Sequence, residues 1–95
     1  MDQQYQCPKI IYIDINTDIQ HEKYKEFKNE TTMKGWKFHE SKMWTRKGNK
    51  KQKDTNIDIV ITKNIQKEEI TITWGFLTDS SDHRPIHVRC YFKKT

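Results

Sequence analysis

Ninety-five residues, of which 33% are hydrophobic and 33% charged, predict one small and polar domain with room for a modest core. Its isoleucines cluster in periodic segments, which argues against a disordered tail, and no stretch is apolar enough for a membrane span or a signal peptide. The net charge of +5 favours a polyanionic partner, while Cys7 and Cys90 are too few for a disulfide scaffold and indicate free thiols in an intracellular protein.

The first element is predicted at residues 9–16, after a polar lead that ends at Pro8. Residues 10–13 form a continuous apolar run, which is typical of a strand covered on both faces. Asp14 and Asn16 would point the same way at the carboxyl end of this strand, where ligands bind in α/β sheets. An Asx turn followed by a helix cap explains the same polar residues, and their spacing leaves both interpretations open.

A surface helix is predicted over residues 19–30, followed by a break at Gly35. His21 falls on the polar side of this helix, where we expect it to be solvated. The narrow apolar stripe that would face a sheet consists of Ile19, Tyr24 and Phe27. A short strand is predicted next, around residues 36–39, with a histidine at its end.

A basic loop follows the end of a short extended segment near Trp44. Cationic side chains beside an aromatic ring suit the phosphate backbone of a nucleic acid, whereas a solvated hairpin loop explains the same charges without a ligand. The candidate nucleic-acid-binding residues are Trp44, Thr45, Arg46, Lys47, Lys50, Lys51 and Lys53.

The clearest strand is predicted at residues 56–62. Ile57, Ile59 and Ile61 would face one side, and the other side would carry Asp58 together with Val60 and Thr62. A carboxylate inside a strand is costly to bury without a partner. Asp58 is therefore expected either to pair with a histidine or to lie on an exposed face.

Two closing strands are predicted after a loop or single helical turn at residues 63–69. Apolar side chains recur at every second position from 70 to 76 and again from 86 to 92. The polar loop between these strands carries Asp82 and His83, and Pro85 opens the second strand, where no ladder donor is needed. An adjacent carboxylate and imidazole on such a loop are well placed to hold a metal and a phosphate.

Three segments in this order resemble a known family. They are residues 11–16 (IYIDIN), 57–61 (IDIVI) and 81–86 (SDHRPI). Together they are similar to the C-terminal half of the endonuclease/exonuclease/phosphatase family, the deoxyribonuclease I-like fold, and most similar to endonuclease domains of non-LTR retrotransposons. The likeness spans about residues 10–92, and the chain departs from the family pattern at Ile13, where the family has glycine, and at Ile15, where it has an aromatic residue.

The resemblance implies an α/β fold and a partial domain. Residues 1–95, with a core at about 9–93, would form half of a deoxyribonuclease I-like sandwich, with one mixed sheet of about five strands and one main surface helix at about 19–30. The N-terminal half of the family domain would be missing, and with it an asparagine and a metal-binding glutamate. The lone half would expose an apolar sheet face, so we expect a protein partner or a homodimer to cover it.

The resemblance also implies Mg²⁺-dependent cleavage of DNA. Asp14 would orient or deprotonate the attacking water, and Asn16 would hydrogen-bond the scissile phosphate. His83 would stabilise the developing charge while Asp58 fixes its ring, and Asp82 would contribute to the Mg²⁺ site.

Half of a site rarely catalyses, so an N-terminal half or a partner is expected to complete it. An inactive half-domain that serves as an assembly or nucleic-acid-binding subunit is the alternative. A nuclear location is compatible with a DNA substrate.

Overall fold

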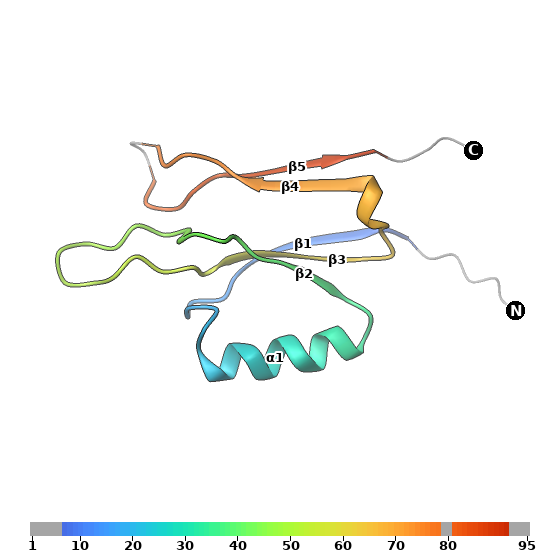
Figure 1. The fold of residues 1–95 in the computed structure, drawn as a ribbon, viewed down its shortest axis with the longest axis horizontal. Helices are drawn as coiled ribbons and strands as arrows, with labels where there is room; N and C mark the ends of the chain where they lie inside the picture. Colours follow the sequence, from blue (N-terminus) through green and yellow to red (C-terminus); the bar gives the residue numbers. More distant parts are fainter. Residues whose placement is uncertain (1–6, 79–80, 92–95) are drawn as a thin grey trace, which may run out of the picture.

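The computed structural model describes residues 7–78 and 81–91, whose elements stack in layers. Figure 1 shows a helix on one face of a three-stranded sheet and a two-stranded sheet on the other face. The elements are β1 (Lys9–Asp14), α1 (Glu22–Met33), β2 (Lys37–His39), β3 (Asp58–Lys63), a 3-10 turn η1 (Lys67–Glu69), β4 (Ile70–Trp74) and β5 (Ile86–Cys90). The strand order of the larger sheet is β1-β3-β2, and β4 pairs with β5.

The predicted α/β class is confirmed, but the single mixed sheet of about five strands is wrong. The five strands divide into sheets of three and two, and every pairing between them is antiparallel. The division follows from the connection after β3, where Asn64 adopts a left-handed conformation with φ of 63° and Ile65 is buried. This turn and η1 lead the chain onto the face of the first sheet, so β4 does not continue along its edge (Figure 1).

The core is centred on β3, the middle strand of the larger sheet. Ile59 and Ile61 pack against Tyr24 of α1 on one face, as the predicted alternation requires, and Asp58, Val60 and Thr62 are buried on the other. Because β3 has a neighbour on each edge and a layer on each face, it can bury every side chain from Asp58 to Thr62. The apolar residues packed around this cluster are Ile13, Ile15, Ile19, Trp36 and Phe38.

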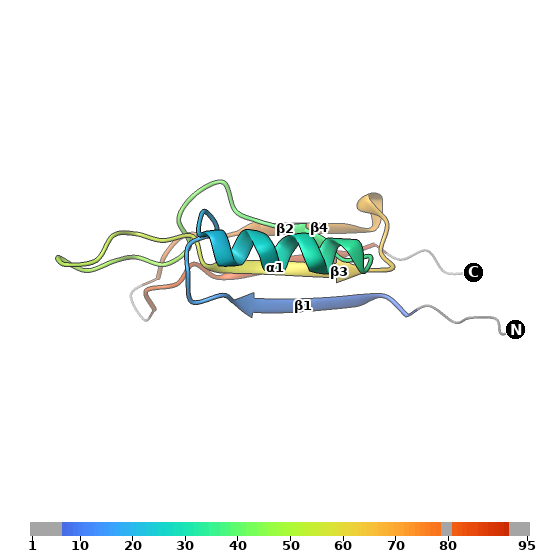
Figure 2. The same cartoon turned by 90° about the horizontal axis from the view of Figure 1, so that it is seen from below.

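The sequence predicts that residues 10–13 form a strand with both faces covered. The strand is confirmed, but its faces are not both covered. β1 forms, but it is an edge strand, and Ile10 and Ile11 are exposed by 39% and 42%. Figure 2 shows that α1 lies beneath β2 and β3, whereas β1 lies to one side of it. An apolar run on an edge strand leaves backbone donors and acceptors available for pairing with another chain.

The helix begins and ends three residues later than predicted, at Glu22 and Met33. Residues 18 and 19 instead bond to Asn56, just before β3. Ile19 N donates to Asn56 O at 3.0 Å, and Asp18 Oδ2 accepts from Asn56 N at 2.9 Å. His21 is the N-cap, since its Nδ1 accepts from Lys23 N at 3.1 Å.

The remaining sequence predictions concern short elements and the two cysteines. β2 ends at the predicted histidine, and η1 is the predicted helical turn. β4 ends at Trp74, so Phe76 lies beyond it, while Phe92 and residues 79–80 of the polar loop lie outside the described residues. Both cysteines are free thiols. Within the part of the chain that the structure describes, no helix has the length and apolar character of a membrane span.

Candidate functional site

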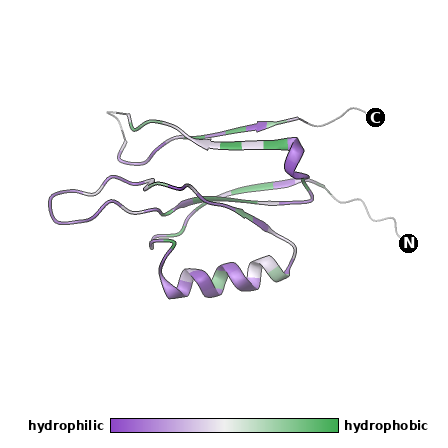
Figure 3. Ribbon diagram, in the orientation of Figure 1, coloured by the Kyte–Doolittle hydropathy of each residue, from purple (hydrophilic) through white to green (hydrophobic). Residues whose placement is uncertain are grey.

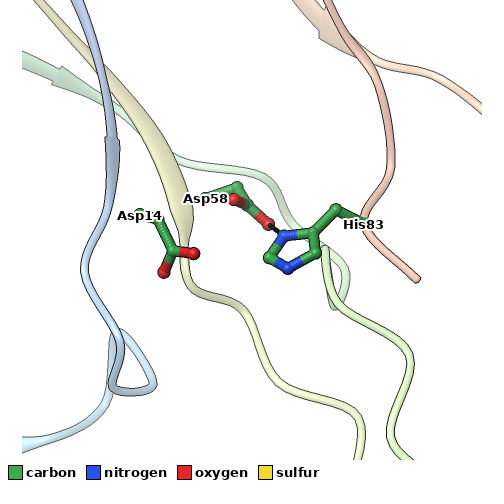
Figure 4. A group of neighbouring side chains, drawn as sticks. All are labelled: Asp14, Asp58 and His83. Carbon is green, nitrogen blue, oxygen red and sulfur yellow. Dashed lines mark hydrogen bonds and ion pairs between the residues drawn. The ribbon is translucent and has the colours of Figure 1, made fainter. Parts of the chain in front are cut away.

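Two carboxylates and an imidazole meet at one end of the larger sheet. Asp14 ends β1, Asp58 begins β3, and His83 lies on the loop before β5; each offers a ligand atom within 4.8 Å of the others. Asp14 and Asp58 are directly opposite in the β1–β3 register, which places their side chains on the same face. Figure 4 shows His83 reaching toward this face from the other side of the site.

Asp58 is the most constrained member of this acid–histidine group. It is only 1% exposed, and its Oδ2 accepts a hydrogen bond from His83 Nδ1 at 2.8 Å. The other carboxylate oxygen, Oδ1, accepts from the hydroxyl of Tyr12. Both oxygens therefore have a donor, which offsets the desolvation of a buried charge. Of the two alternatives that the sequence left open for Asp58, the structure has the buried acid–histidine pair.

The backbone around Asp58 is held as firmly as its carboxylate. Thr45 Oγ1 accepts from the backbone N–H groups of both Ile57 and Asp58, each at 3.0 Å. Trp74 Nε1 donates to the carbonyl of Asp58 at 3.1 Å. These contacts come from the loop that carries Thr45 and from β4, so two separate segments hold the backbone at the start of β3.

The His83 loop is attached along its backbone to residues 45–47. Arg84 N donates to Thr45 O at 2.7 Å, and Lys47 N donates to Asp82 O at 2.6 Å. The Arg84 side chain lies over the Trp44 ring, 4.0 Å from its centroid, and donates from Nε to Trp44 O at 2.8 Å. Since Thr45 and Arg46 also bond to Thr55, this strand-like seam joins the His83 loop to the chain that leads into β3.

Asn16 and Asp82 lie at the margin of the group. The backbone N–H of Asn16 donates to Asp14 Oδ1 at 3.0 Å in an Asx turn, and its φ of 55° is left-handed, a conformation that asparagine tolerates. Asp82 is exposed and lies outside the 4.8 Å group. Its Oδ2 is 3.5 Å from Arg46 Nε, and its Oδ1 is 3.8 Å from His83 Nε2.

The predicted basic loop is a hairpin that projects beyond the strands at the same end of the molecule as the site (Figure 1). We call residues 46–55 the basic hairpin. Asn49 Oδ1 accepts from Lys51 N and Gln52 N at its tip, and Asp54 Oδ1 accepts from Gly48 N at 2.9 Å. A Cβ on Gly48 would lie 2.1 Å from Gln52 O, so the crossing of the two arms requires glycine there.

The cations of the basic hairpin differ in availability. Lys47 pairs with Asp54 at 3.5 Å and lies over the Trp44 ring, and Arg46 is engaged by Asp82. The exposed cations without an ion pair to another described residue are Lys50, Lys51 and Lys53. Figure 3 shows the whole hairpin as hydrophilic.

The position of Thr45 departs from the prediction that it lies near a DNA strand. Its side chain is 0% exposed, because its hydroxyl accepts from two backbone amides in the interior. Sequence reasoning also missed Tyr12 and Trp74 as partners of Asp58. These contacts join residues 46 and 16 positions apart, and local periodicity carries no signal for such pairs.

Comparisons of the chain with protein-family models, with curated proteins and with solved structures found no match.

Proposed function

We propose that this chain forms the acid–histidine part of a metal-dependent phosphodiesterase site that cleaves DNA. The observation that carries the proposal is the 2.8 Å contact between buried Asp58 and His83, with the Asp14 carboxylate beside it. A histidine held in this way can exchange a proton through its second nitrogen, and a neighbouring carboxylate can align water. Phosphodiester hydrolysis needs both an aligned nucleophile and stabilisation of charge on the phosphate.

The finer assignment of the fold belongs to the same proposal. We assign the chain to the C-terminal half of a deoxyribonuclease I-like sandwich. Support comes from the order of the three sequence motifs and from the meeting of their polar side chains at one end of the sheet.

In the proposed reaction each member of the group has one role. Asp14 orients the attacking water. With both ring nitrogens of His83 protonated, Nδ1–H donates to Asp58, and Nε2–H faces the phosphate and donates to it as negative charge develops. Asn16, two residues after Asp14, provides a hydrogen bond to a second phosphate oxygen.

A magnesium ion fits Asp14 better than the other members of the group. Both oxygens of Asp58 already accept hydrogen bonds, and an imidazole nitrogen is a poor ligand for Mg²⁺. Asp14 is exposed, and one carboxylate together with substrate phosphate oxygens is a common way to hold this ion. When bound, Mg²⁺ would supply positive charge to the phosphate. The role of Asp82 at the Mg²⁺ site stays a prediction. No glutamate joins the group among the described residues, so a glutamate ligand would come from a partner chain.

The proposal predicts that His83→Ala slows the Mg²⁺-dependent nicking of supercoiled plasmid by about 100-fold or more, the usual range for loss of an acid–base group. The measurement is the conversion of supercoiled to open-circular DNA over time. His87→Ala is the matched control, because His87 is exposed on β5 and lies outside the acid–histidine group. Equal nicking by the wild type and by His83→Ala, or nicking that persists in EDTA, would contradict catalysis by this chain.

A second candidate function is binding of nucleic acid without turnover, and the projecting basic hairpin favours it. If Lys50 and Lys51 contact phosphates, replacing both with alanine releases fewer counterions on binding. The slope of log K against log salt should then become shallower by about two, or about one per lysine. Fluorescence anisotropy with a labelled DNA duplex over a range of salt concentrations measures this slope.

The matched control for the hairpin is Lys23→Ala with Lys25→Ala. These residues are exposed on α1, on the face of the sheet opposite to β4 and β5, and their removal changes the net charge equally. A salt slope that shifts as much for the control as for the hairpin variant would indicate a general charge effect and reject the hairpin as the contact.

A further inference from the structure

The hydroxyl of Tyr12 contacts the acid–histidine pair from the edge strand. Tyr12 lies opposite Val60 in the β1–β3 register, and its hydroxyl reaches along the sheet to donate to Asp58 Oδ1. His83 Nδ1 occupies the other carboxylate oxygen at 2.8 Å. The three side chains therefore form a continuous chain of hydrogen bonds from β1, through β3, to the loop before β5.

The hydrogen bond from Tyr12 restrains the carboxylate of Asp58, which the contacts to the Asp58 backbone do not hold. Thr45 and Trp74 hold the amide and the carbonyl of Asp58, but neither bonds to its carboxylate. The hydrogen bonds that oppose rotation of this carboxylate about its Cβ–Cγ bond are those from Tyr12 and His83. Without the Tyr12 donor, Oδ1 would be a buried acceptor with no partner, and the carboxylate could turn away from His83.

The hydroxyl of Tyr12 is the donor in its contact with Asp58 Oδ1. An ionised carboxylate can only accept, so a protonated phenol at Oδ1 and a protonated Nδ1 at Oδ2 are mutually consistent.

We propose that Tyr12 is a positioning residue that fixes the Asp58 carboxylate and, through it, the tautomer and orientation of the His83 ring. Residues that hold the partner of a functional histidine typically change activity by about 10-fold to 100-fold when they are replaced. The catalytic part of this inference rests on the proposed function, whereas the structural part concerns His83 alone. Tyr12 lies within the first of the three sequence motifs, but the resemblance assigns no role to its phenol.

Tyr12→Phe tests the inference, because it removes only the hydroxyl. In long-range ¹H–¹⁵N spectra of the histidine rings, we expect the His83 signals to move away from the pattern of a ring protonated at Nδ1. The nicking rate should fall about 10-fold with little change in KM. Tyr91→Phe is the control: Tyr91 is exposed to about the same extent as Tyr12 but lies beyond β5, away from the acid–histidine group. Unchanged His83 signals in Tyr12→Phe would overturn the inference, even if the variant were less stable.

A measurement on the wild-type chain covers the case in which Tyr12→Phe does not fold. The ¹³Cζ signal of Tyr12 should be displaced from that of Tyr91 in the direction of a phenol that donates to a carboxylate, and equal signals would overturn the inference. The spectra also separate this inference from the proposed function. A shift of the His83 signals in a chain that shows no nicking supports the positioning role and rejects catalysis by this chain alone.

Discussion

Replacing Asp58 with asparagine should lower the rate of plasmid nicking by about 10²-fold to 10⁴-fold. Asparagine keeps the shape of the buried side chain, and its Oδ1 can still accept from Tyr12. Its amide group would then face His83 Nδ1 as a donor, so the ring would have to carry its proton on Nε2. A ring held in this way could not also carry a proton on Nδ1, so it would lack the positive charge that opposes the charge developing on the phosphate. Initial rates of nicking at saturating Mg²⁺ measure the loss, and the ring ¹⁵N signals of His83 report the tautomer.

The control for this substitution is Glu26→Gln, which makes the same change from acid to amide on the exposed surface of α1. Glu26→Gln should nick DNA at the wild-type rate. If Asp58→Asn also nicked at that rate while its His83 signals showed the inverted tautomer, the acid–histidine pair would have only a structural role, and the proposed reaction would be wrong.

Ile59→Ala should destabilise the folded chain by about 2–5 kcal/mol, the range for truncating a fully buried isoleucine. Ile59 is 0% exposed in the middle of β3 and packs with Tyr24 and Ile61. Truncation leaves a cavity between β3 and α1, which the surrounding layers can fill only in part. For a small domain, such a loss is a large part of the free energy of unfolding. Urea denaturation followed by circular dichroism measures it.

Ile11→Ala removes the same atoms from β1, where Ile11 is 42% exposed at the edge of the sheet. We expect a loss of about 1 kcal/mol or less, because the side chain leaves water only in part on folding. Equal losses at Ile11 and Ile59 would contradict the position of β3 at the centre of the core.

The two strands with isoleucine-rich sequences illustrate how far periodicity predicts structure. Alternation in residues 57–62 predicted both faces of β3, and the burial of Ile59 and Ile61 against α1 confirms one of them. The apolar run at residues 10–13 predicted a strand, which forms, but the same run gave the wrong position in the sheet. Hydrophobicity favours burial, whereas the number of neighbouring strands depends on segments far away in the chain.

The helix boundary differs from prediction for a similar reason. Residues 19–21 fit the helical period, but bonds from Ile19 N and Asp18 to Asn56 hold the chain in a turn before α1. His21 is exposed, as predicted, and is also the cap, because its Nδ1 accepts from Lys23 N in the first turn of α1. Local propensity is a weak determinant wherever a tertiary bond competes with the first helical turn.

The residues of the candidate site were identified from sequence in part. Asp14, Asp58 and His83 stand in three separate motifs, and the resemblance of those motifs to one family was the reason to expect them together. The structure brings all three within 4.8 Å and leaves Asp82 outside that group. Thr45, chosen as a surface contact, is an interior acceptor, because the direction in which a side chain points depends on what lies on either side of its backbone.

The sequence by itself determined the elements of this protein: the strands, the helix, the turn before β4 and the basic hairpin, each of which has a pattern within a few residues. Only the tertiary structure decided that the strands form two antiparallel sheets and that Tyr12, Asp58 and His83 form one chain of hydrogen bonds. The physical reason is the separation along the chain of the residues that interact. Backbone geometry makes side chains alternate within each strand, but the covering of a face and the partner of a buried carboxylate depend on the burial of the whole chain.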